Sequence, residues 1–395
     1  MNYATHYDVG DRKRDDGINE DSVAVSVFEQ GHREGFLGHH RADADADRGT
    51  TAEESDTERD HAAEGDSAAD GERSADAADS GDDRASNRSA AVFALADGAG
   101  GHDAGDAASY IATTAVCEHL AGTVVAAARS DPGGFDVAVG DPLPATPRAD
   151  DLEAAVAEAV VTAHREVLAY AAESGQQAHT TVVAGAVVGG SLHYGWVGDS
   201  RAYLVNAARE ETVPLTTDHA VVQRLRDADQ IDDVEALVHP RGNEITRAVG
   251  GSGAADPGTA TVNVETATVP LYREDVVLVT SDGLLDAQTE AAKLYEWYVD
   301  AGRDDEMAEV VRDRAVTDDE IRDRILSAAS LDAAATDLVD MANERGGKDN
   351  LSTLLFRDDA LPATPDARRF PTRAIEPDEP VEDRSTVIEI GRAHV

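Results

Sequence analysis

Three aspartates lie at the ends of short apolar runs, and their residue type and placement indicate a cation site. Asp97 follows residues 91–96, Asp282 follows residues 276–281, and Asp349 comes just before residues 351–356. Such apolar, β-branched-rich runs bounded by glycine are typical of strands buried on at least one face. Each aspartate alone could cap a turn or a helix. Together, held at strand ends and converging, they favour binding of a hard cation.

The elements that position these aspartates can be predicted from periodicity and from turn residues. Strands are expected over residues 3–10, 21–28, 90–96, 179–188, 191–198, 200–206, 259–269, 275–280 and 351–357. Helices are expected over residues 106–128 and 151–174, and a charged helical segment over 286–345. In the second helix, Leu152, Val156 and Val160 recur at the spacing of one helix face. The pattern predicts an α+β domain.

Two stretches lack the apolar residues that a folded core needs. Residues 29–89 are mostly Asp, Ala, Glu, Ser, Gly, Arg and His, and residues 358–395 are rich in Pro and Asp. Such segments cannot bury enough surface to offset the entropy of ordering. We therefore expect one domain over residues 1–357, interrupted by a disordered acidic insert that acts as a spacer or a partner-binding segment. Residues 389–395 look like a translated sequencing adapter.

The charge balance limits the partners. The formal net charge is -45, from 79 acidic and 34 basic residues, which argues against nonspecific binding to nucleic acid or an anionic membrane. Only Lys13, Lys293 and Lys348 are lysines. This composition resembles that of proteins from halophilic archaea, although a GC-rich genome would also favour arginine. The single Cys117 and the absence of a long apolar run predict a cytoplasmic protein.

Several short motifs occur in an order that carries a resemblance. They are residues 19–21, 97–102, 180–181, 198–201, 215–219, 246–250, 281–284 and 348–350. In this order they resemble the metal-dependent serine/threonine protein phosphatases of type 2C, in their bacterial and archaeal form. The resemblance implies a four-layer α-β-β-α sandwich of two antiparallel sheets flanked by helices, with metal ions at one end. It also implies a signal-transduction enzyme that hydrolyses phosphoserine and phosphothreonine in phosphorylated proteins.

The resemblance also assigns roles to residues. Asp97 would bridge two divalent ions with the Gly98 carbonyl as a further ligand, and Asp282 and Asp349 would hold the second ion. Glu20 and Asp21 would hydrogen-bond the metal-bound waters. Asp199, with Asp282, would hold a third ion, unless Asp199 simply belongs to a hairpin turn. An all-oxygen site suits Mg2+ or Mn2+ and argues against zinc.

Two positions depart from the family pattern. The arginine that binds phosphate usually lies four residues before the acidic pair, but Asp16 occupies that position here, so Arg14 is the candidate phosphate ligand. The alternative is that Arg14 is a solvated surface residue that does not bind phosphate. Ala99 stands where many eukaryotic relatives have a histidine, and His102 nearby is expected to be structural. The nucleophile would be a water activated by two metal ions.

The sequence also allows two other interpretations of the function. The chain could be a catalytically weak pseudophosphatase that binds phosphoproteins as a regulatory scaffold, or an acidic binding protein without metal. The charged segment 286–345 is predicted to form a flap over the active site that selects substrates, or else a helical hairpin without substrate contact. We expect a monomer that binds neither nucleic acid nor membranes.

Overall fold

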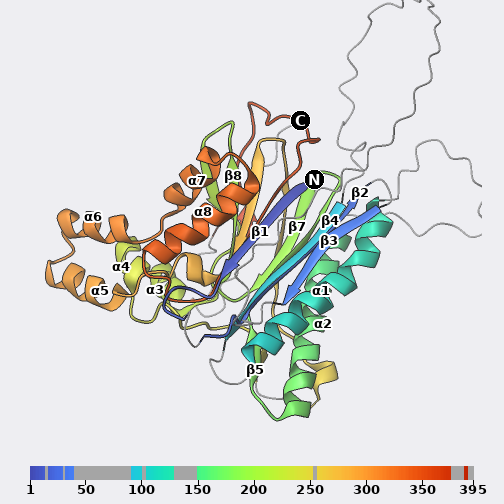
Figure 1. Cartoon of the computed structure of the whole chain (residues 1–395), viewed down its shortest axis with the longest axis horizontal. Helices are drawn as coiled ribbons and strands as arrows, with labels where there is room; N and C mark the ends of the chain where they lie inside the picture. The colour runs from blue at the N-terminus through green and yellow to red at the C-terminus, as the bar shows by residue number, and fades with distance from the viewer. Residues whose placement is uncertain are drawn as a thin grey trace, which may run out of the picture.

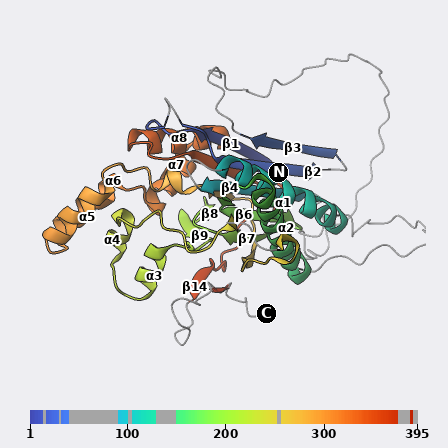
Figure 2. The same cartoon turned by 90° about the horizontal axis from the view of Figure 1, so that it is seen from below.

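The computed structural model describes residues 1–13, 17–29, 32–39, 90–99, 104–128, 149–251, 256–374 and 387–389. These residues form two antiparallel β-sheets that pack face to face, with helices on both outer faces (Figure 1). Figure 2 shows the same four layers from below. The expected α-β-β-α sandwich is confirmed.

The first sheet carries two of the three key aspartates at its strand ends. Its strand order is β1 (Asn2–Asp8), β13 (Leu351–Arg357), β12 (Asp275–Thr280), β8 (Arg201–Asn206) and β9 (Glu211–Pro214). All of these neighbours pair antiparallel. The strand at the N-terminus therefore lies next to the strand that follows Asp349.

The second sheet carries Asp97. Its main order is β3 (His32–His39), β2 (Asp21–Glu29), β4 (Ala90–Ala99), β6 (Val182–Val188), β7 (Ser191–Val197) and β11 (Glu265–Pro270). The end of β4 also pairs with β5 (Ala178–Thr180), which pairs in turn with β10 (Val249–Gly251). The predicted strand over residues 259–269 begins only at Glu265, after the short 3-10 turn Pro257–Thr259.

Alternation along β4 explains the layers. Ala91, Phe93 and Leu95 lie in the core between the sheets, against residues such as Leu354 and Phe356 of β13. Val92, Ala94 and Ala96 face the opposite way and pack on α1 (Gly105–Ala128) and α2 (Ala149–Ser174). Successive side chains of a strand point to opposite faces, so one apolar strand serves two cores.

The outer face of the first sheet is covered by two helices near the C-terminus. These are α7 (Asp318–Ser327) and α8 (Leu331–Glu344), which bury Ile321, Leu338 and Val339 against Tyr203 and Leu278 of the sheet. No helix among the residues that the structure describes is both long enough and apolar enough to cross a membrane.

A separate helical group lies beyond one end of the sandwich. It consists of α3 (Val221–Asp227), α4 (Asp233–Val238), α5 (Ala291–Asp300) and α6 (Asp305–Arg314). A small cluster holds α4, α5 and α6 together, with Val234, Val238, Leu294, Tyr298 and Val311 as members. We call these four helices the helical cover, and in Figure 1 they extend away from the sheets.

The prediction of disorder from residue 29 onward is wrong for the first residues of the insert. Strand β2 continues to Glu29, and β3 pairs with it from His32 to His39. Composition cannot detect this strand, because backbone pairing with the open edge of β2 supplies hydrogen bonds that do not depend on side-chain type. Residues 40–89 lie outside the described part of the chain.

The prediction of a disordered tail from residue 358 is also wrong for its first part. Residues 358–374 fold back on the domain, where Leu361 is buried in the core between the sheets and Phe370 packs against it. Arg368 forms a buried ion pair with Asp275. Two apolar residues and one buried arginine change the average composition of residues 358–395 too little to indicate a folded segment. The short β14 (Thr372–Ala374) follows and pairs with β15 (Val387–Glu389), and residues 390–395 are not described.

Candidate metal centre

Antiparallel pairing brings the predicted carboxylates to one end of the sandwich. Asp21 at the start of β2 lies directly opposite Asp97 near the end of β4. Asp282 follows the end of β12, and Asp349 precedes the start of the neighbouring β13. Since the end of one antiparallel strand lies beside the start of its partner, each sheet contributes a pair of aspartates here.

Backbone contacts fix the turn that follows Asp97. The Asp97 amide donates to Thr181 Oγ1 at 3.0 Å, and the Asp97 carbonyl accepts from the Thr181 amide at 2.9 Å. The Gly98 amide donates to the Glu20 carbonyl at 3.1 Å. A Cβ atom at Gly98 would lie 2.3 Å from the Gly105 carbonyl oxygen, so only glycine fits. The Gly98 carbonyl, a predicted ligand, is thus held in place by packing.

The two sheets are joined beneath these aspartates by hydrogen bonds. Ser281 Oγ donates to Asp21 Oδ2 at 2.9 Å, which links β12 to β2 across the sandwich. The Glu20 amide donates to Asn350 Oδ1 at 3.0 Å, next to Asp349. A Cβ at Gly283 would lie 1.9 Å from the Asn350 carbonyl oxygen, which shows how closely the turns after β12 and before β13 approach. The positions of the carboxylates are therefore coupled through the backbone.

Burial and mutual repulsion raise the pKa of the clustered carboxyl groups. Burial raises the pKa of Asp97 well above its usual range, and the nearby Asp21 and Asp282 raise it further. The pKa of Asp282 is raised in the same direction by burial and then by Asp199 and Asp349. Burial raises the pKa of Asp21 to about 6. These electrostatic interactions agree with the strand pairing, which places Asp21 and Asp97 of one sheet and Asp282 and Asp349 of the other at the same end of the sandwich.

Asp199 reaches the same cluster from the turn before β8. Its side chain is buried, and burial followed by repulsion from Asp218 raises its pKa to about 7. Its charge also acts on Asp97 and Asp282. The preceding Gly198 has a φ of 112°, and its amide donates to His219 Nδ1 at 3.0 Å. Asp199 belongs to a turn, as one interpretation held, and that turn faces the candidate metal centre.

The cation that the structure brings into the site is Lys13. Its ammonium donates to Asp349 Oδ1 and also lies near Glu20 and Asp97. Burial opposes the charge of Lys13, but the Asp349 carboxylate outweighs this effect, and the pKa of Lys13 is raised. Arg14, the predicted phosphate ligand, and His102 both lie outside the described residues. The sequence did not indicate Lys13, because the family pattern calls for an arginine four residues before Glu20.

The donor set fits a hard divalent cation, although it is not preassembled. Oδ1 of Asp21 is buried and receives no hydrogen bond from the described residues, and the main charges that act on Asp97 are those of other carboxylates. No three His, Cys, Asp or Glu side chains in the described ranges already converge to hold an ion. Lys13 engages Asp349 and Lys348 engages Asp286. Before an ion could bind, the carboxylate side chains would have to rotate slightly, and Lys13 would have to release Asp349.

Asp286 is a further acidic residue that sequence reasoning missed. It lies four residues after Asp282, its amide donates to the Asp282 carbonyl at 2.8 Å, and its charge raises the pKa of Asp282. Burial raises the pKa of Asp286 itself. The spacing of four residues, which is typical of one helical turn, was the available signal.

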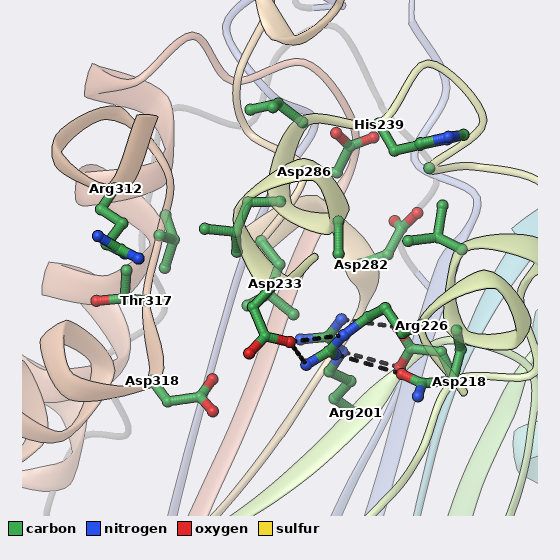
Figure 3. A pocket seen from close by; sticks show the side chains of 18 of the residues that line it. Arg201, Asp218, Arg226, Asp233, His239, Asp282, Asp286, Arg312, Thr317 and Asp318 are labelled. Carbon is green, nitrogen blue, oxygen red and sulfur yellow. Dashed lines mark hydrogen bonds and ion pairs between the residues drawn. The ribbon is translucent and has the colours of Figure 1, made fainter. Parts of the chain in front are cut away.

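A cavity of about 630 Å³ opens next to these aspartates. Asp199, Asp282 and Asp286 line one end of it, and residues of α3, α4, α6 and α7 form its walls. Figure 3 shows Arg201, Asp218, Arg226 and Asp233 gathered on one side, with Arg312, Thr317 and Asp318 on the other. Arg201 binds Asp218 through two hydrogen bonds of 2.8 and 2.7 Å. The walls thus come from residues 218–250 as well as from the segment 286–345.

The chain matches a model of the protein family described as Protein phosphatase 2C over residues 66–317, which is more than half of its length. The chain therefore belongs to the protein phosphatase 2C family, and it is a protein phosphatase. Among its relatives is the serine/threonine phosphatase stp of Listeria innocua, which is 28% identical over 267 residues, covering 67% of this chain and 83% of that protein.

Solved structures share the fold. The serine/threonine phosphatase PstP/Ppp of Mycobacterium tuberculosis superposes with a TM-score of 0.52 at 23% identity, covering 90% of this chain and 97% of that one. Stp1 of Staphylococcus aureus gives a TM-score of 0.53 at 20% identity, over 91% and 95% of the two chains. At this level of identity the similarity supports the architecture alone.

Proposed function

We propose that this phosphatase removes phosphate from phosphoserine and phosphothreonine in proteins, with Mg2+ or Mn2+ held by Asp97, the Gly98 carbonyl, Asp282 and Asp349. The observation that carries the proposal is the group of buried and partly buried carboxylates at one end of the sandwich, among which the pKa values of Asp97 and Asp282 are raised. Buried carboxylates that repel one another are costly unless cations neutralise them. Oxygen donors of this kind suit both ions.

The residues of the site have separate roles in the proposed reaction. When bound, two divalent ions supply an activated water as nucleophile and neutralise the phosphoryl oxygens. Glu20 and Asp21 would accept hydrogen bonds from waters on the bound ions and orient those waters. Asp199, with Asp282, provides the site for a third ion. Cys117 is buried at mid-helix in α1 and does not serve as a nucleophile.

The same proposal assigns phosphate binding to the turn at residues 10–13, where the ammonium of Lys13 contacts Asp349. The loop backbone is pinned beside Asp349, because the Arg12 amide donates to the Gly347 carbonyl at 3.1 Å and the Lys13 amide to the Gly10 carbonyl at 3.0 Å. An ammonium can hold phosphate as a point charge, where a guanidinium would bind it through two hydrogen bonds. Arg14, the next residue in the sequence, remains the alternative phosphate ligand.

Lys13→Gln distinguishes phosphate binding from simple competition with metal, and Arg12→Gln serves as the exposed control. If Lys13 holds phosphate, KM for a phosphopeptide rises by roughly tenfold and inhibition by inorganic phosphate weakens. If Lys13 only shields Asp349, Mn2+ binds more tightly and KM stays unchanged, which would leave Arg14 as the phosphate ligand.

The central test is phosphate release from a phosphothreonine peptide in molar KCl, with Mn2+, with chelator, and with Asp282→Asn. Chelation and the substitution should each abolish release. Equal rates with and without chelator would contradict the metal mechanism. A regulatory scaffold is the second candidate, favoured by the ion pair of Lys13 with Asp349. A wild-type protein that binds Mn2+ and phosphopeptide without turnover would support the scaffold.

The proposal extends to the setting of the enzyme. The net charge of -45 suits a protein of halophilic origin, because molar salt screens repulsion to a Debye length of about 3 Å. We propose a cytoplasmic monomer in signal transduction that acts on phosphorylated proteins and binds neither nucleic acid nor membranes. Activity and melting temperature that do not increase with KCl would remove the halophilic part of this proposal.

A further inference from the structure

Helix α3 forms part of the cavity wall but has little packing of its own. It is seven residues long, its N-cap Ala220 provides no side-chain hydrogen bond, and Val222 is its one buried residue. Val222, Gln223 and Arg226 all line the cavity. A short helix without a side-chain cap and with one buried residue depends on tertiary contacts for its position.

The folded-back tail supplies such a contact. Arg373 in β14 donates two hydrogen bonds to the Asp227 carboxylate at the end of α3, at 2.7 and 2.6 Å. The Asp227 side chain is only 8% exposed in this pair. A bidentate pair between a guanidinium and a largely buried carboxylate fixes orientation as well as distance. In Figure 2, β14 lies on the side of the molecule that carries α3.

Hydrogen bonds continue from this ion pair to the cavity. Gln223 Nε2 donates to Asp227 Oδ1 at 2.8 Å, and Gln223 Oε1 accepts from Arg226 Nη1 at 3.4 Å. Arg226 in turn donates to Asp233 at the start of α4, at 2.6 Å. The Asp227 carboxylate that Arg373 binds is therefore hydrogen-bonded directly to Gln223, one of the residues that line the cavity.

The tail is itself anchored on the rigid part of the molecule. The Arg368 side chain is 3% exposed, pairs with Asp275 beside β12, and lies 4.6 Å from the ring centroids of both Tyr272 and Phe370. Asp275 also accepts from Asn206 Nδ2 at 2.7 Å. Arg373 follows this anchor by five residues, so the segment that carries it is held to the sheet at Arg368 and reaches α3 at Arg373.

We propose that residues 358–374 form a strap that positions α3, with Arg373 as the positioning residue, and that the strap sets the shape of the cavity for protein substrates. The inference rests on the proposed phosphatase function. A phosphopeptide that reaches the aspartates extends along the cavity walls, whereas a small aryl phosphate does not need them. Loss of the strap should therefore weaken binding of a peptide and leave the chemistry at the aspartates intact.

The experiment compares Arg373→Ala with Arg369→Ala, an exposed arginine of the same segment. In the full chain, Arg373→Ala should speed hydrogen exchange of the α3 amides by about tenfold, since the helix opens locally more often. KM for a phosphothreonine peptide should rise roughly fivefold. The kcat/KM for p-nitrophenyl phosphate should stay unchanged, and Arg369→Ala should match the wild type in all three.

A charge reversal separates the ion pair from a general effect on stability. Asp227→Arg alone should behave like Arg373→Ala, and the double variant Asp227→Arg with Arg373→Asp should recover both slow exchange and low KM. Unchanged α3 exchange and peptide KM in Arg373→Ala would overturn the strap. If the wild type hydrolyses neither substrate, the phosphatase proposal fails, while the exchange measurement still decides whether the strap holds α3.

Discussion

The strand-end aspartates and the helical cover lie side by side but are built in different ways. Asp97, Asp282 and Asp349 each adjoin a strand that pairs along most of its length, and the turns beside them are joined by short hydrogen bonds. The cover is assembled from helices within residues 221–238 and 291–314, and Arg373 of the tail pairs with Asp227 of α3. Under the proposed function, the strand-end aspartates fix the chemistry. The helical cover can change shape to accept different substrates.

The cores of the two regions differ in the same way. The clusters around the sheets contain most of the buried apolar residues described, including Trp196, Phe93 and Leu278. The cover depends on the smaller cluster around Leu294 and on ion pairs such as that of Arg303 with Glu235. Regions with few buried apolar contacts open at lower free energy than the global unfolding. The cover should therefore move while the aspartates remain in place.

The largest expected effect comes from Asp97→Asn, which attacks the rigid region directly. Phosphopeptide hydrolysis should fall by roughly 10³-fold, because a carboxylate proposed to hold the metal ions that neutralise the phosphoryl oxygens is lost. The metal-free variant should melt no lower than wild type, since one buried, repelled carboxylate has been neutralised. Calorimetry with activity assays checks both results, with the exposed Asp150→Asn as control. A variant that loses both activity and stability would mean that Asp97 is structural.

The same apolar truncation in each region should give different results. Leu278 in β12 and Leu294 in α5 are both fully buried, and removing either side chain to Ala costs about 2–5 kcal/mol. Leu278→Ala should lower the global free energy of unfolding. Leu294→Ala should mainly speed hydrogen exchange in α4, α5 and α6 and raise KM for phosphopeptides. Equal loss of protection in β4 and β12 by both variants would show that the cover and the sheets unfold together.

A smaller effect concerns pH and compares His193 in β7 with His239 at the cavity. Burial lowers the pKa of His193 to about 4, and burial with Arg241 lowers that of His239. A neutral buried imidazole resists protonation in the folded state, so its contribution to stability is present above pH 6.5 and is lost as pH falls towards 4. For His193 the loss is on the order of 3 kcal/mol.

Urea unfolding at pH 7 and pH 4.5 tests this difference. His193→Gln should reduce the loss of stability between the two pH values, and His239→Gln should change it much less, because the cover opens independently of the sheets. A larger effect at His239 would contradict the proposed division between the two regions.

Much of the site could be predicted from the sequence because its signals are local. Asp97 and Asp282 follow continuous apolar strands, and the turns at Gly98 and Gly283 need glycine for close backbone approach. The strand order could not be read from these runs. The division into two antiparallel sheets flanked by helices came from the family resemblance, and the structure confirms that division.

Other residues were missed because their partners lie far away in the chain. Lys13 stands between two arginines, and only the turn at residues 10–13 directs it to Asp349, which is 336 residues distant. Strand β3 and the strap at residues 358–374 sit in segments whose average composition predicts disorder, and pairing with β2 or burial of Arg368 outweighs that average.

The sequence by itself determined that carboxylates would stand at the ends of buried strands, because strand periodicity and glycine turns act over a few residues. The tertiary structure alone decided what surrounds them. It brought Lys13 to Asp349, placed α6 and α7 opposite α3, and joined Arg373 to Asp227 across 146 residues. Contacts of this kind depend on how the layers pack and leave no regular spacing in the sequence.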